Sequence, residues 1–142
     1  MKCVTLLKPI ILTLIVTLKV TLLSAQSTDS ITGIWHVEEV KVSPAASIEE
    51  LKAANIIKKD LQKTTFNFKA NHHAIVTSTN PDISIPNGYW EYTASKKNIT
   101  ITEWKDRLKK NRGILMSIIV ESDAGKTFFH LEETPIRLAV KK

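Results

Sequence analysis

The sequence predicts an all-β fold, an eight-stranded antiparallel up-and-down barrel with one α-helix between the first and second strands. From Thr64 onward, apolar and polar residues alternate with a period of two, and short turn sequences separate the runs. Only one segment, near residues 48–62, has apolar residues at helical spacing. Eight short strands in one small domain leave exposed edges unless the sheet closes on itself, so a barrel is favoured.

The first 25 residues have the pattern of a secretory signal peptide. A basic N-terminus is followed by Pro9–Leu23, which is apolar or Thr except at Lys19, and then by the small residues Ser24-Ala25. We therefore predict cleavage after Ala25 and export of residues 26–142 to the periplasm or the extracellular space. The alternative is an uncleaved N-terminal anchor, because Lys19 interrupts the apolar run.

Composition limits what the exported domain can do. The chain has 142 residues and a formal charge of +6, with 20 Lys and Arg against 14 Asp and Glu. Three of these cations and no acidic residue lie in the first 25 residues, which leaves +3 and argues against nucleic-acid binding. The single cysteine, Cys3, also lies there, so the mature domain depends on its hydrophobic core alone. The mature domain contains no second apolar run of membrane-spanning length.

The first predicted strand covers Ile31–Val42 and contains an irregularity. Its apolar alternation changes phase between Val37 and Val40. Such a change indicates a β-bulge or a sharp bend. The alternative is that Glu39 points into a polar interior.

The predicted helix begins at a capping box. Ser47 stands three residues before Glu50, so the hydroxyl and the carboxylate can each accept from the other residue's backbone amide. Apolar residues at helical spacing follow, and we expect a helix over about Ile48–Gln62. Lysines 52, 59 and 63 lie on its other face.

The remaining seven strands follow the helix. Phe66 and Phe68 share one face of the first of them, and Lys105–Arg112 is a polar, basic connection. The predicted ranges are Thr65–Ala70, Ala74–Thr79, Tyr89–Ala94, Asn98–Glu103, Ile114–Glu121, Thr127–Glu132 and Ile136–Val140.

Several of these segments resemble a known family. Ile31–Val37, with Gly33 and Trp35, resembles the Gly-x-Trp opening strand of lipocalins and other calycins. The segments Phe66–Asn71, Gly88–Tyr92 and Asn98–Ile101 are similar to the middle of small secreted bacterial lipocalin-like domains. The resemblance covers most of residues 31–140.

The resemblance implies a barrel closed at one end by the opening tryptophan. Gly33 and Trp35 match that motif, and Arg137 on the last strand is expected to pack over the Trp35 ring as a cation–π contact. A helix after the first strand departs from the usual lipocalin plan. It is closer to the fatty-acid-binding proteins, which have two helices there.

The resemblance also implies a small hydrophobic or amphipathic ligand in the barrel interior. The alternative is a packed core without a ligand, because any barrel needs alternating apolar residues. The candidate cavity-facing residues are Phe66, Phe68, Trp90, Tyr92, Ile99, Ile101, Met116 and Ile118.

No sequence signal points to catalysis, a metal or a cofactor. His72 and His73 are adjacent and would face opposite sides of a strand, and the other two histidines are isolated. No serine lies in a nucleophile motif and no phosphate-binding loop is visible. We therefore expect a protein that is not an enzyme and has neither metal nor cofactor.

The second functional hypothesis is an envelope module that binds a protein or a polysaccharide and has a packed core. The basic connection carries five cations against one acidic residue and could attract an anionic partner, whereas solvation alone would also account for it. Its candidate contacts are Lys105, Arg107, Lys109, Lys110 and Arg112.

Overall fold

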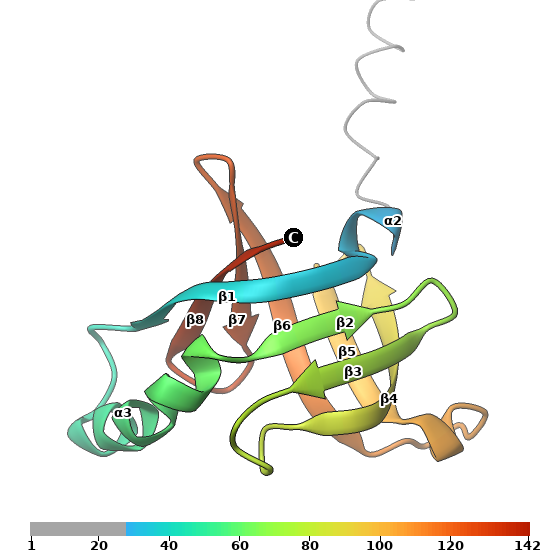
Figure 1. Ribbon diagram of the computed structural model, residues 1–142, viewed down its shortest axis with the longest axis horizontal. Coiled ribbons are helices and arrows are strands. Elements are labelled where there is room, and N and C mark those ends of the chain that lie inside the picture. The colour runs from blue at the N-terminus through green and yellow to red at the C-terminus, as the bar shows by residue number, and fades with distance from the viewer. Residues whose placement is uncertain (1–27) are drawn as a thin grey trace, which may run out of the picture. The chain divides into compact units, whose positions relative to one another are not determined.

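The computed structural model describes residues 28–142, and it confirms the predicted fold class. Eight antiparallel strands form a closed barrel in sequence order, with one long helix between the first two strands (Figure 1). The predicted signal peptide lies outside the described residues. The elements are α2 (Thr28–Ile31), β1 (Gly33–Val42), α3 (Ile48–Gln62), β2 (Thr65–Phe68), β3 (His73–Thr77), β4 (Ile85–Thr93), β5 (Asn98–Glu103), the 3-10 helix η1 (Trp104–Asp106), β6 (Ile114–Asp123), β7 (Lys126–Leu131) and β8 (Ile136–Lys141).

Strand β1 begins later than predicted and contains the expected bulge. Ile31 ends the short helix α2, and the strand starts at Gly33, whose φ of 134° suits glycine. The pairing of β1 with β8 shifts register between Val37 and Glu39. Glu39 is exposed, so the phase change in the sequence is a bulge and not an inward carboxylate.

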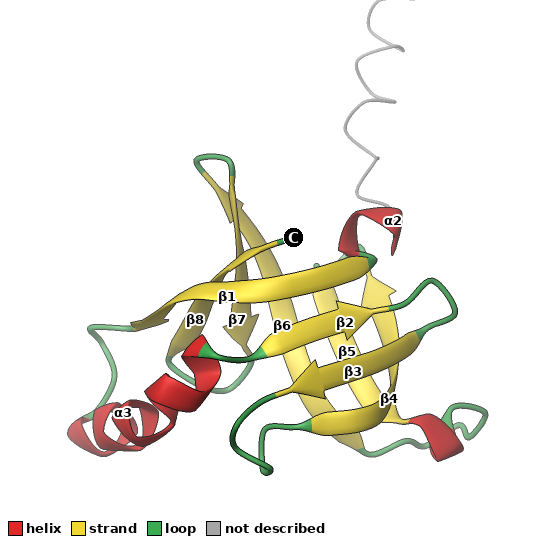
Figure 2. Cartoon of the chain, in the orientation of Figure 1, coloured by secondary structure: helices red, strands yellow, loops and turns green. Residues whose placement is uncertain are grey.

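Helix α3 has the predicted bounds and the predicted cap. Glu50 N donates to Ser47 Oγ at 3.2 Å, and Ser47 N donates to Glu50 Oε2 at 2.7 Å. Ala54 and Leu61 are the buried residues of the helix. Figure 2 shows α3 beside the barrel wall, after the end of β1.

Strand β4 begins four residues earlier than predicted. Its first residues, Ile85 to Gly88, precede the predicted range Tyr89–Ala94 and include Pro86. The β3–β4 pairing shifts register between Ala74 and Val76, and such a bulge tolerates a proline within a strand. A Cβ added at Gly88 would lie 2.7 Å from Ile101 Cγ2, so the barrel wall requires glycine at this point.

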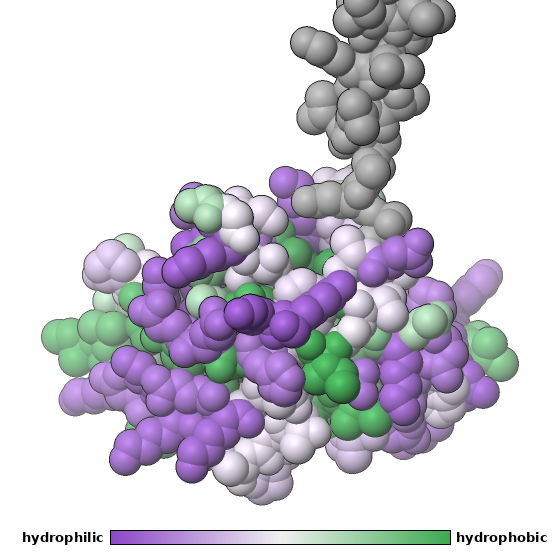
Figure 3. Space-filling view, turned by 45° about the horizontal axis from the view of Figure 1, so that its top comes forward, coloured by the Kyte–Doolittle hydropathy of each residue, from purple (hydrophilic) through white to green (hydrophobic). Residues whose placement is uncertain are grey.

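The antiparallel order gives the barrel two different ends. The Trp35 end holds the start of β1, the β2–β3, β4–β5 and β6–β7 turns, and the end of β8. The helix end holds α3 and the β3–β4, β5–β6 and β7–β8 connections. The face in Figure 3 is mostly polar, with hydrophobic side chains standing out at its two sides.

One hydrophobic core fills the barrel, and all of its residues lie between Ile31 and Val140. Residues 31–142 form one compact unit. Because this unit contains its own closed sheet and core, we expect residues 26–142 to fold on their own.

Candidate ligand-binding site at the helix end

The structure places most of the predicted cavity-facing residues in a filled core. Tyr92 and Met116 are partly buried and pack against that core. The other six are at most 1% exposed: Phe66, Phe68, Trp90, Ile99, Ile101 and Ile118.

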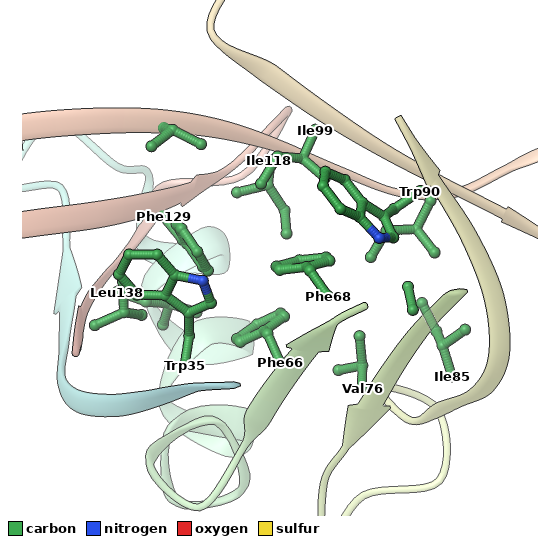
Figure 4. Packing of buried hydrophobic residues seen from close by; sticks show 14 of the residues in the cluster. Trp35, Phe66, Phe68, Val76, Ile85, Trp90, Ile99, Ile118, Phe129 and Leu138 are labelled. Carbon is green, nitrogen blue, oxygen red and sulfur yellow. The ribbon is translucent and has the colours of Figure 1, made fainter. Parts of the chain in front are cut away.

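Aromatic rings occupy the space between the walls (Figure 4). Phe129 lies 5.4 Å from both Trp35 and Phe66, and Phe68 lies 5.3 Å from Trp90, between ring centroids. Sequence reasoning left out Phe129, although it stands at an inward position of the alternation with Leu131. The rings therefore form one contiguous cluster from Trp35 to Trp90.

At the Trp35 end, the basic residue that lies over Trp35 is not the one expected. Trp35 Nε1 donates to the Ile31 carbonyl at 2.7 Å, and Lys142 Nζ lies 4.8 Å from the Trp35 ring centroid. The expected contact of Arg137 with Trp35 was wrong. Arg137 lies over Phe128 at 3.7 Å and donates to Glu121 Oε2 at 2.7 Å. Its neighbours in β8 point inward, so alternation turns Arg137 outward.

Two hollows at the helix end adjoin each other at Leu115 and Met116. The smaller, of about 260 Å³, lies between the starts of β4 and β6, with Ile83 and Ile85 in its lining. The larger, of about 570 Å³, extends from Met116 to Leu131 and the β7–β8 turn. Met116 is the one predicted cavity-facing residue that lines these two hollows.

A β-bulge shapes this rim. Met116 pairs with Ile101, but the next pair joins Thr102 to Ile114, so Leu115 is the extra residue. The hydroxyl of Thr102 is buried without a hydrogen-bond partner among the described residues. Leu115 itself is left exposed between the two hollows.

Carboxylates supply the charged groups of both hollows. Glu103 faces Gly88 across the β4–β5 pair, on the same side of β5 as Ile99 and Ile101, and it lines the smaller hollow. Within residues 28–142, no hydrogen bond or ion pair engages its carboxylate. Glu132 and Glu133 line the larger hollow. The site therefore combines an apolar floor with acceptor groups at its edge.

Arg112 anchors the basic β5–β6 connection to the outside of the barrel, and Arg107 packs on Trp104 at the start of the connection itself. The Arg107 guanidinium lies 4.5 Å from the Trp104 ring centroid, and that of Arg112 lies 5.1 Å from the Tyr89 ring centroid. Arg112 also forms an ion pair with Glu91 at 2.8 Å. These arginines therefore hold the loop in place.

The lysines of the same connection are more exposed. Lys109 Nζ lies 2.7 Å from Asp106 Oδ1. That hydrogen bond, with the charges of Lys109 and Lys105, lowers the pKa of Asp106 below its ordinary value. Lys105 and Lys110 are exposed to solvent.

Three histidines take part in hydrogen bonds that fix local structure. His72 Nδ1 lies 3.0 Å from the Trp90 carbonyl, His73 Nε2 lies 2.8 Å from Asn87 Oδ1, and His130 Nε2 lies 2.9 Å from the Thr134 carbonyl. Over residues 28–142, no three His, Cys, Asp or Glu side chains are grouped to hold a metal ion.

Comparisons of the chain with protein-family models, curated proteins and solved structures found no significant match. The closed eight-stranded barrel is compatible with a lipocalin-like fold. Within the described part of the chain, none of the helices has the length and apolar character needed to cross a membrane.

Proposed function

We propose that this chain is an exported, lipocalin-like binding protein without catalytic activity, and that it holds a small hydrophobic or amphipathic molecule at the helix end of its barrel. One observation carries the proposal. The two helix-end hollows share Leu115 and Met116, whereas aromatic side chains fill the interior below them. The ligand position is therefore shallower than the resemblance alone implied.

The chemistry of the hollows fits an amphipathic ligand. Ile83, Ile85 and Leu131 offer apolar surface, and the flexible thioether of Met116 can adapt to ligands of different shape. The larger hollow, at about 570 Å³, has the size of a small-molecule site. Glu132 already accepts from Asn98 and Ser117, whereas the carboxylates of Glu103 and Glu133 at the edge can accept hydrogen bonds from a polar group on the ligand.

Export is supported by the sequence of the first 25 residues. N-terminal sequencing of the protein recovered from the envelope or the culture medium tests it. We expect Gln26 as the first residue. Recovery of the intact N-terminus in the membrane fraction would favour the anchor instead.

Displacement of a fluorescent fatty acid or a fluorescent alkylamine from residues 26–142 tests the binding role. Met116→Trp places a bulkier side chain between the two hollows, so we expect at least a ten-fold loss of affinity, or about 1.4 kcal/mol. The matched control is Ile34→Trp, an exposed apolar position at the Trp35 end. Absence of binding to both probes, or equal affinity in both variants, would overturn the proposal.

The second candidate is an interaction module with a packed core, and the filled interior favours it. Capture of partners from an envelope fraction tests it. The informative variant replaces Lys105, Lys109 and Lys110 by Ser and leaves Arg107 and Arg112 unchanged, because those two hold the loop in place. Loss of a captured partner in this variant, with small-molecule binding absent, would favour the module.

A further inference from the structure

Large hydrophobic side chains are exposed mainly at one end of the described domain. Six are strongly exposed, and only Ile34 lies at the Trp35 end. The other five lie at the helix end: Ile48 and Ile56 on α3, Leu108 in the β5–β6 connection, and Ile114 and Leu115 at the start of β6. They form two groups, one on α3 and one on the β5–β6 connection and the start of β6, and exposed apolar groups of this kind indicate contact surfaces.

Leu108 is the most exposed of them, at 91%, and cations surround it. Lys109 and Lys110 follow it directly, and Lys105 precedes it by three residues. Arg112 packs on Tyr89, and Trp104 at the start of the connection lies 5.0 Å from His73 between ring centroids, so the segment that carries Leu108 is fixed to the barrel at both ends. Little ordering entropy then opposes its insertion into a partner.

Helix α3 presents a second apolar and cationic face. Ile48 and Ile56 are 73% and 78% exposed. At about 100° per residue, they fall within about 80° of the helix circumference together with Lys52, Lys59 and Lys63. Ala54 and Leu61 occupy the opposite side and are buried. Hydrophobic side chains stand out in Figure 3 on the side where α3 lies and on the side of the β5–β6 connection.

We propose that the helix end of the barrel docks on the headgroup surface of an anionic lipid bilayer, with Leu108 and Ile56 inserted among the lipids. Apolar side chains beside lysines are what such an interface binds, because the apolar groups enter the headgroup region and the lysines are attracted to anionic lipids. The two faces lie on separate elements at the same end, so an extended surface can engage both. The β7–β8 turn with Glu132 and Glu133 lies between α3 and the β5–β6 connection on one side of this end, and the β3–β4 connection with Asp82 lies between them on the other side. The contact is therefore tilted away from the β7–β8 turn.

Co-sedimentation of residues 26–142 with vesicles tests the docking, and it needs no knowledge of a small ligand. We expect binding to vesicles of equal parts phosphatidylglycerol and phosphatidylcholine, weak binding to phosphatidylcholine alone, and a decline with added salt. Leu108→Ser should weaken the partition coefficient about ten-fold, the effect of about 1.4 kcal/mol. Ile56→Ser should lower it by a smaller factor.

The control is Ile34→Ser, which removes an exposed side chain of similar size at the opposite end and should leave binding unchanged. All three positions are exposed, so the fold is expected to survive, and a thermal melt checks it. The proposal is overturned by equal binding to both vesicle types or by an equal loss in the Ile34 control. It is also overturned if replacing Lys105, Lys109 and Lys110 by Gln abolishes binding while the double variant Leu108→Ser/Ile56→Ser retains it, because binding would then depend on charge alone and not on insertion of the two apolar side chains.

Discussion

Both ends of the barrel carry large apolar side chains, but these side chains are packed at the Trp35 end and partly open to solvent at the helix end. At the Trp35 end, the indole is hydrogen-bonded to Ile31, lies under Lys142 and packs against Phe129. At the helix end, Met116 borders two hollows, and Leu108 and Ile56 are open to solvent. With the ligand site proposed at the helix end, substitutions at the two ends should have separable effects on stability and on binding.

The largest expected effect is on the free energy of unfolding, and it compares one truncated side chain in the aromatic cluster with one at the helix end. Phe129→Ala should lower the free energy of unfolding by about 3–5 kcal/mol, because it leaves a cavity among three packed rings. Met116→Ala should cost only about 1 kcal/mol, because its side chain already borders open space. Urea denaturation measures both. Similar losses would mean that the helix end is packed as tightly as the rest.

A smaller effect distinguishes two glycines. Gly88→Ala should destabilise by about 1–3 kcal/mol, because the new methyl group would overlap Ile101 and approach Ile85. A methyl group added at Gly113, in the connection at the helix end, would meet no atom within 4 Å, so Gly113→Ala should be neutral or raise stability by about 0.4–1 kcal/mol. Thermal unfolding of both variants is the measurement. A Gly88→Ala protein as stable as the wild type would contradict the close packing of Gly88 against Ile101.

The smallest effect concerns Asp106 in the basic connection. Its pKa is lowered in the folded state, so its contribution to stability is present above the ordinary value of 3.8 and is lost as the pH falls through the folded value. Lys109→Gln removes the hydrogen bond and should move the pKa of Asp106 back toward 3.8. A carboxyl titration by NMR detects this. An unchanged pKa would show that Lys109 does not hold this carboxylate in solution.

Most of the fold could be predicted because local chemistry determines it. The capping box of Ser47 and Glu50 gave the start of α3, and the phase change around Glu39 indicated the bulge in β1. The start of β4 could not be predicted, because the turn-forming sequence around Pro86 is accommodated by a bulge that depends on β3. Pairing across strands is a tertiary property that one segment does not encode.

The site was harder to predict for a related reason. Alternation assigned Phe66, Phe68 and Trp90 to the inside, but a hollow barrel and a filled one have the same alternation. Whether rings meet at the centre depends on Phe129, which comes from a distant strand. The alternation of Arg137 with Ile136 and Leu138 was enough to predict that Arg137 faces outward. The family resemblance led instead to the expectation that it packs over Trp35.

The pairing of the first strand with the last has a consequence for how the chain folds during synthesis and during the export that we propose. His36 lies opposite Lys141 and Val42 lies opposite Ile136, so the ring of strands cannot close until almost the whole chain is available. Contacts of such long sequence separation form slowly, because the loop between them must first be ordered. Until β8 arrives, one edge of β1 has no partner strand. A chain with this connectivity remains open, and therefore threadable through a narrow export channel, until its last residues emerge.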